Sequence, residues 1–157
     1  MAIQLGQKER MLLEDQKKHE EICIKKYNNY AAQASDPQLK QLFSTYAGQE
    51  QQHYDTINQI LAGQMPGMGQ QKGQQQQQMQ QAASMGRLPA GSYQNDAALC
   101  NDMLMTEKYV SNTYDTAIFE MADTNVRQAL NHIQKEEQQH GEGIFNYMKN
   151  MGMYQPQ

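Results

Sequence analysis

The sequence has 157 residues and a net charge of −4, which suit one folded domain large enough to bury a core. The acidic balance gives no electrostatic basis for binding nucleic acid or an anionic membrane. No apolar run approaches the length of a membrane span, and the N-terminus opens on polar and charged residues, so we expect synthesis in the cytoplasm without a signal peptide.

A first pair of helices is predicted over residues 7–62. Apolar residues recur every three or four positions up to about Ala34, and again after a short break, which is typical of helix faces turned toward a partner. In the break, Asp36 suits an N-cap and Pro37 suits the first helical position. Such a short turn forces the two helices to run antiparallel, and Gly63 should end the second one.

Residues 63–92 have a different composition. Glycine, methionine and proline come first, a glutamine-rich run follows, and apolar content is low throughout. This composition cannot form a packed core and predicts a flexible linker. A connection of about thirty residues is long enough to travel the length of a helical bundle, so the next helix is expected to begin at the opposite end.

A second pair of helices is predicted over residues 95–151. The third helix should end near Ala122, and Asp123 should cap the fourth helix as Asp36 caps the second. Gly152 should then stop the fourth helix. The second half therefore repeats the helix–turn–helix pattern of the first.

A four-residue motif, Glu-Gln-Gln-His, occurs twice, beginning at Glu50 and again 87 positions later at Glu137. A further glutamate, Glu20 or Glu107, precedes each motif by 30 residues. In each motif the Glu and the His fall where the helical periodicity demands a core residue. Because a lone buried charge is too costly, these side chains must be paired, neutralised or bound to metal. The matched spacing is an internal repeat on the scale of a helix pair.

The repeat predicts a dinuclear metal site. Ferritin-like bundles build such sites from one Glu on each of two helices and a Glu-x-x-His on each of the other two, and they carry one long crossover. The predicted fold is all-α, a single ferritin-like four-helix bundle of two antiparallel hairpins joined by a long crossover. The predicted metal ligands are Glu20, Glu50, His53, Glu107, Glu137 and His140. These donors suit two Fe or two Mn ions, with the motif carboxylates as the bridges.

Several neighbouring residues are assigned lesser roles. Tyr27 and Tyr114, two turns beyond the single glutamates, are expected to fill the core or to donate a hydrogen bond to a ligand carboxylate. His19 and His132 lie off the core face and are expected at the surface, and Glu136 is expected to be solvated. The alternative to a metal site is a layer of carboxylates that bond only to each other and to the histidines. Repulsion among four clustered carboxylates argues against that alternative.

Three runs of the second half, residues 104–109, 114–120 and 144–154, resemble the Coat F family of spore coat proteins. The resemblance is specific over residues 95–154. The first half resembles that family through the internal repeat and a general likeness to rubrerythrin-type helix pairs. This resemblance implies a ferritin-like fold, expression during sporulation, a location in the spore coat and other coat proteins as partners. It implies no chemistry by itself.

Two functional classes remain open. The first is an oxidoreductase, catalase-like or peroxidase-like, whose di-iron or di-manganese centre acts on peroxide or oxygen. The second is a structural coat component with a stabilising or vestigial metal site and no catalysis. A homodimer is kept open for either class.

Overall fold

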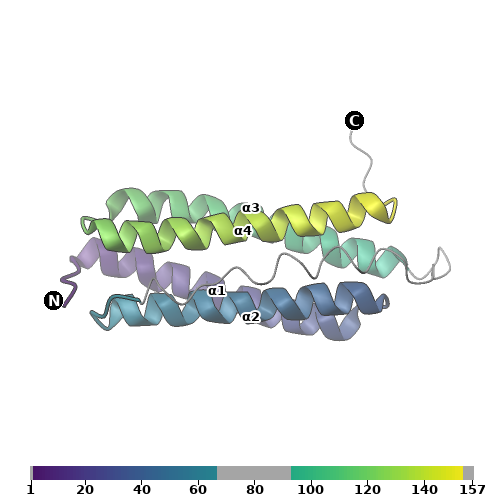
Figure 1. The fold of residues 1–157 in the computed structure, drawn as a ribbon, viewed down its shortest axis with the longest axis horizontal. Helices are drawn as coiled ribbons and strands as arrows, with labels where there is room; N and C mark the ends of the chain where they lie inside the picture. The colour runs from purple at the N-terminus through teal and green to yellow at the C-terminus, as the bar shows by residue number, and fades with distance from the viewer. Residues whose placement is uncertain (1, 67–92, 154–157) are drawn as a thin grey trace.

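The computed structural model describes residues 2–66 and 93–153, and within them the chain forms a bundle of four long helices (Figure 1). The helices are α1 (Gln7–Gln33), α2 (Pro37–Leu61), α3 (Tyr93–Glu120) and α4 (Thr124–Asn150). Helices α1 and α2 pack closely as one hairpin and α3 and α4 as another, which confirms the predicted all-α bundle of two hairpins. No helix in the described segments is long and apolar enough to cross a bilayer.

The direction of the helices agrees with the predicted topology. Helix α2 ends at one end of the bundle, whereas α3 begins at the opposite end. Helices α2 and α3 therefore run in the same direction (Figure 1). Each hairpin is antiparallel, and across the hairpins α1 faces α3 while α2 faces α4. The predicted linker lies mainly in residues 67–92, which are outside the described residues.

The ends of α2 and α4 explain why the two hairpins match. Asp36 and Asp123 cap these helices with nearly the same backbone angles, φ −81° and ψ 122° in one and φ −81° and ψ 124° in the other. Each carboxylate accepts a hydrogen bond from the backbone N–H two residues later. Both helices stop before a glycine at positive φ, Gly63 at 82° and Gly152 at 70°, a conformation that other residues adopt only with strain.

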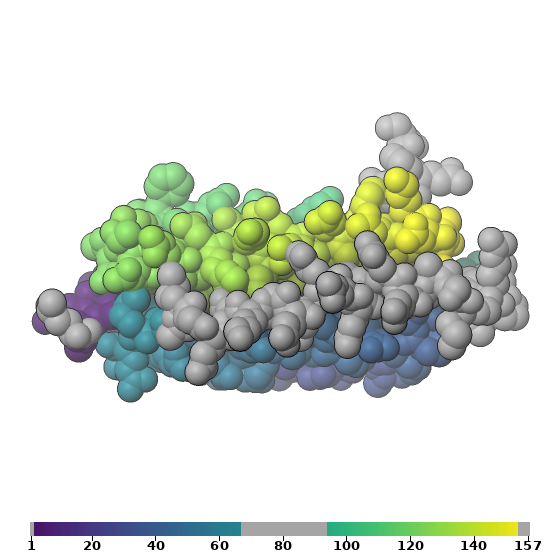
Figure 2. Space-filling view, in the orientation of Figure 1, coloured from purple at the N-terminus to yellow at the C-terminus, as the bar shows by residue number. Residues whose placement is uncertain are grey.

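The apolar core forms two clusters along the bundle. One contains Leu13, Ile57, Ile60 and Leu130 among its members, and the other is built around Phe43. The two clusters occupy opposite ends, so the middle of the bundle is left to the buried glutamates and histidines. Figure 2 shows the resulting body as elongated, with the α3–α4 hairpin along one long side and the α1–α2 hairpin along the other.

Candidate metal centre

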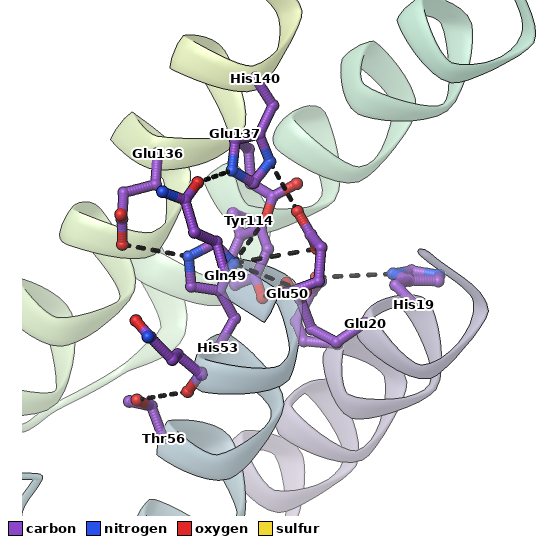
Figure 3. A network of polar contacts seen from close by, with 12 residues as sticks. His19, Glu20, Gln49, Glu50, His53, Thr56, Tyr114, Glu136, Glu137 and His140 are labelled. Atoms are coloured by element: carbon purple, nitrogen blue, oxygen red, sulfur yellow. Dashed lines mark hydrogen bonds and ion pairs between the residues drawn. The ribbon is translucent and has the colours of Figure 1, made fainter. Parts of the chain in front are cut away.

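The six predicted ligands meet in one layer at the middle of the bundle, several of them drawn in Figure 3. Each helix contributes to the layer: Glu20 comes from α1, Glu50 and His53 from α2, Glu107 from α3, and Glu137 and His140 from α4. All six side chains belong to residues that are 2% exposed or less. A three-residue spacing on a helix advances about 4.5 Å along the axis and turns about 60°, so one helix presents its Glu and His to the same place.

The ligand atoms fall into two overlapping groups. Glu20 and His53 form one group with the two motif carboxylates, and Glu107 and His140 form the other with the same two carboxylates. Within each group, the candidate ligand atoms lie within 4.8 Å of one another. Glu50 and Glu137 are therefore shared by both groups, and they are the residues that would contact both ions of a bound pair.

The contacts between the hairpins are reciprocal. His53 Nδ1 lies 2.7 Å from Glu137 Oε1, and His140 Nδ1 lies 2.7 Å from Glu50 Oε1. Neither contact has the alignment of a hydrogen bond, and both of these carboxylate oxygens lack a hydrogen-bond partner. The buried, unpartnered side-chain atoms of this layer are Glu20 Oε2, Glu50 Oε1 and Oε2, His53 Nδ1, Glu107 Oε2, and Glu137 Oε1 and Oε2.

Unpartnered buried polar atoms are costly, and here they converge on common points. Four carboxylates and two imidazole nitrogens are the donor set that two divalent ions of the Fe or Mn type accept. The charges also balance, since four carboxylates offset two divalent cations. The residues of this layer therefore fit a dinuclear metal centre.

Two tyrosines hold the single glutamates in a matched way. The Tyr27 hydroxyl donates to Glu107 Oε1 at 2.5 Å, and the Tyr114 hydroxyl donates to Glu20 Oε1 at 2.5 Å. Each tyrosine thus orients the glutamate of the other hairpin. Burial raises the pKa of both hydroxyls well above the usual value, and the adjacent carboxylate charge raises the pKa further, so both stay protonated donors. Both tyrosines are buried and donate to the single glutamates, and their role beside a metal ion stays a prediction.

The four carboxylates have unequal affinities for protons. Burial raises the pKa of Glu50 and Glu137 well above the usual value, and repulsion from the other glutamates adds to this rise. Burial also acts to raise the pKa of Glu20 and Glu107. The contact of each with a shared carboxyl group, and then the contacts with the histidine and tyrosine neighbours, hold this pKa below the usual value. Any metal that binds must therefore displace protons from the two shared carboxylates.

Burial acts to lower the pKa of His53, but the charge of Glu20 and the contact with Glu136 raise it well above the usual value.

The position of Glu136 corrects a prediction. It was expected to be solvated, but its side chain is only 19% exposed, and its Oε1 lies 3.1 Å from His53 Nε2. His132, expected at the surface, is partly buried and lies 3.0 Å from the same oxygen. Burial would raise the pKa of Glu136, but the contacts with these two histidines hold it below the usual value.

Gln49 is the residue of the first half that matches Glu136, 87 positions earlier. Its Oε1 contacts His140 Nε2, as Figure 3 shows. Both residues come directly before the Glu of a motif and both reach the histidine of the other motif. Sequence reasoning missed this pair, although the repeat, extended by one position, would have paired these two residues.

A hollow of about 270 Å³ lies beside the layer, between α1 and α3. Its wall includes Cys23 and Val110, each one turn beyond a single glutamate, and both are buried. Burial and the charges of the four ligand carboxylates raise the Cys23 pKa, so the thiol stays neutral and lies near the carboxylates.

Comparison with protein families gives one match. Residues 95–157 match the Coat F domain, which covers the α3–α4 hairpin and none of α1 or α2. Comparison with curated proteins and with solved structures gives no match. The match supports the Coat F resemblance for the second half of the chain.

Proposed function

We propose that this chain is a spore coat-associated, ferritin-like protein whose dinuclear Fe or Mn centre acts on peroxide or oxygen. The coat association rests on the Coat F match over residues 95–157. The chemistry rests on the buried layer of six ligands, and other coat proteins are the proposed partners.

One observation carries the proposal: two groups of donor atoms share Glu50 and Glu137, and their buried oxygens have no hydrogen-bond partner. A structural polar layer would be expected to satisfy those oxygens within the protein. A pair of metal ions, when bound, would supply a site at which peroxide or oxygen can exchange electrons.

The chain's own residues prepare that site in three ways. The carboxylates offset the charge of two divalent cations. The contacts at Nε2 of His53 and His140 leave Nδ1 of each ring directed at the layer. Tyr27 and Tyr114 hold the single glutamates in place, and the surrounding apolar clusters keep bulk water out.

Among reactions of this class, disproportionation of hydrogen peroxide to water and oxygen fits the chain best. A peroxidase needs an external electron donor, and a rubredoxin-type donor module requires four cysteines, whereas this sequence has two. Disproportionation balances its own electrons, because one peroxide is oxidised and another is reduced.

The structural alternative is a coat component whose metal only stabilises the bundle. It is favoured by the closure of the site, because all six ligand residues are 2% exposed or less. A substrate as small as peroxide would need to pass between side chains, and the hollow whose wall includes Cys23 and Val110 lies beside the layer.

Metal analysis of the purified protein, followed by a hydrogen peroxide consumption assay without added reductant, separates these functions. Metal together with peroxide consumption that is lost in His53→Ala supports the enzyme. Metal without consumption supports the structural component. A protein that retains no Fe or Mn after incubation with either ion contradicts the metal centre itself.

A further inference from the structure

The two histidine ligands have different supports, although the repeat makes their positions equivalent. Where His53 meets the carboxylate of Glu136, His140 meets the neutral amide of Gln49. Within the ligand layer the reciprocal histidine contacts are both 2.7 Å and the tyrosine contacts are both 2.5 Å. The contact with the single glutamate differs by less, since His140 Nδ1 lies 3.3 Å from Glu107 and His53 Nδ1 lies 3.6 Å from Glu20. The difference in charge lies in the residues behind the histidines, a carboxylate in one case and an amide in the other.

The support behind His53 is charged and held in place. Glu136 Oε1 lies 3.1 Å from His53 Nε2 and 3.0 Å from His132 Nε2, and His132 is one helical turn earlier on α4. The Glu136 carboxylate thus lies between two imidazoles, one of them the ligand ring. An imidazole whose N–H is bonded to a carboxylate has a more basic opposite nitrogen, and it binds a cation more strongly.

The support behind His140 is neutral. The Oε1 atom of Gln49 accepts the Nε2 hydrogen bond, and the Tyr46 ring stacks on the imidazole at 4.2 Å with an angle of 25° between the planes. These contacts hold the orientation of the ring. They add no negative charge, so the Nδ1 of His140 is the weaker donor.

We propose that the two metal positions are unequal, and that the position held by Glu20 and His53 binds its ion more tightly than the position held by Glu107 and His140. Glu136 is the positioning residue that makes this difference, acting through His53. The inference rests on the proposed metal centre, and it adds that loading is stepwise with a defined order. Loss of such an outer partner commonly costs about 10- to 100-fold in metal affinity.

Calorimetric titration of the metal-free protein with Mn²⁺ tests the inequality. The wild-type chain should show two steps about tenfold or more apart in affinity. Glu136→Gln should weaken the tighter step and bring the two together, while the matched control Gln49→Glu should tighten the weaker step. The double variant, which exchanges the two residues, should restore two steps with the order reversed.

Anomalous diffraction from crystals given less than one equivalent of Mn²⁺ identifies the position filled first. The wild-type chain should show its stronger peak beside His53, and the exchanged double variant should show it beside His140. Two equal steps, a first peak beside His140 in the wild type, or an unchanged order in the double variant would each overturn the inference and leave the metal centre standing. Absence of Mn²⁺ binding would overturn both. Both substitutions keep the side-chain size, and circular dichroism checks that the variants fold.

Discussion

The two hairpins present the same ligands to the centre but surround them with different residues. Each supplies one glutamate, one Glu-x-x-His motif and one tyrosine, and the contacts between hairpins agree to within 0.1 Å at the histidines. Behind the ligands the hairpins diverge, with Gln49 in one and Glu136 in the other. Only the second hairpin matches the Coat F domain.

This comparison separates two determinants of the proposed metal site. The geometry follows from local features that both halves share: the aspartate cap, the glycine stop and the three-residue motif spacing. The charge of the site follows from residues one position outside the motif, which the halves do not share. Substitutions made in matched pairs, one in each hairpin, can therefore test geometry and charge separately.

The largest effect is expected at the shared carboxylates. Glu50→Gln and Glu137→Gln should each lower the occupancy of both metal positions, because each carboxylate belongs to both ligand groups. In excess metal, about a thousandfold above the dissociation constant, binding contributes about 4 kcal/mol to the free energy of unfolding, and most of this should be lost. Without metal, a carboxyl group whose pKa is raised by folding destabilises the bundle at neutral pH, so replacing it with a neutral amide should instead stabilise the bundle. Thermal melts of each variant measure both changes, the loss of stability with metal and the gain without it.

The same Tm shift with and without metal would show that the six residues are a structural polar layer. The protein would then be a coat building block. Equal behaviour of the two variants would confirm that the hairpins contribute equivalent bridges.

The histidines come next. His53→Ala and His140→Ala should each remove one of the two ions, because each imidazole belongs to only one ligand group. Elemental analysis after gel filtration measures the remaining metal. If either variant retains both ions at the wild-type level, that histidine is not a ligand.

The tyrosines should show a smaller and equal effect. Tyr27→Phe and Tyr114→Phe each remove a hydrogen bond to a single glutamate, which should lower metal affinity about tenfold. Calorimetric titration measures the loss. Unchanged affinity in both variants would show that the tyrosines only fill the core.

The helix caps should reveal a difference between the hairpins that has no connection to metal. Asp123→Ala should cost about 1 kcal/mol of unfolding free energy, the usual effect of losing an N-cap. Asp36→Ala should cost more, because Asp36 Oδ2 also accepts a hydrogen bond from the Tyr147 hydroxyl at 2.6 Å. Urea denaturation measures both. In a Tyr147→Phe background the extra cost of Asp36→Ala should disappear, and Asp123→Ala, which removes contacts with two backbone N–H groups, should cost at least as much. An Asp36→Ala cost that stays the larger would contradict this role of Tyr147.

The smallest effect is expected in the linker, outside the described residues. Removing the glutamine run 74–78 should leave the unfolding free energy nearly unchanged, since loop-closure entropy varies slowly with length. A loss of several kcal/mol on thermal or urea denaturation would show that the run packs against the bundle.

Much of this arrangement was predictable from the sequence because its signals are local. The Asp36–Pro37 and Gly63 signals placed the limits of α2 within about one residue, and the three- and four-residue spacing placed the ligands on the inner face. The repeat then indicated which glutamates belong together. Each of these signals depends on neighbours along one helix.

The contacts behind the histidines were not predictable in the same way. Glu136 lies at the edge of the core face, and whether it reaches solvent or His53 depends on how α4 is rotated against α2. That rotation is set by packing along the whole bundle, and no short pattern encodes it. The hollow between α1 and α3 was not predictable for the same reason, because it depends on how closely these two helices approach each other.

The central claim is that six residues from four helices hold two metal ions. Anomalous scattering from crystals of the metal-loaded protein, recorded at the Fe and Mn absorption edges, tests it most directly. We predict two peaks about 3.5–4 Å apart in the middle of the bundle, both within ligand distance of Glu50 and Glu137. Absence of peaks in this layer, or peaks only at the surface, would contradict the claim.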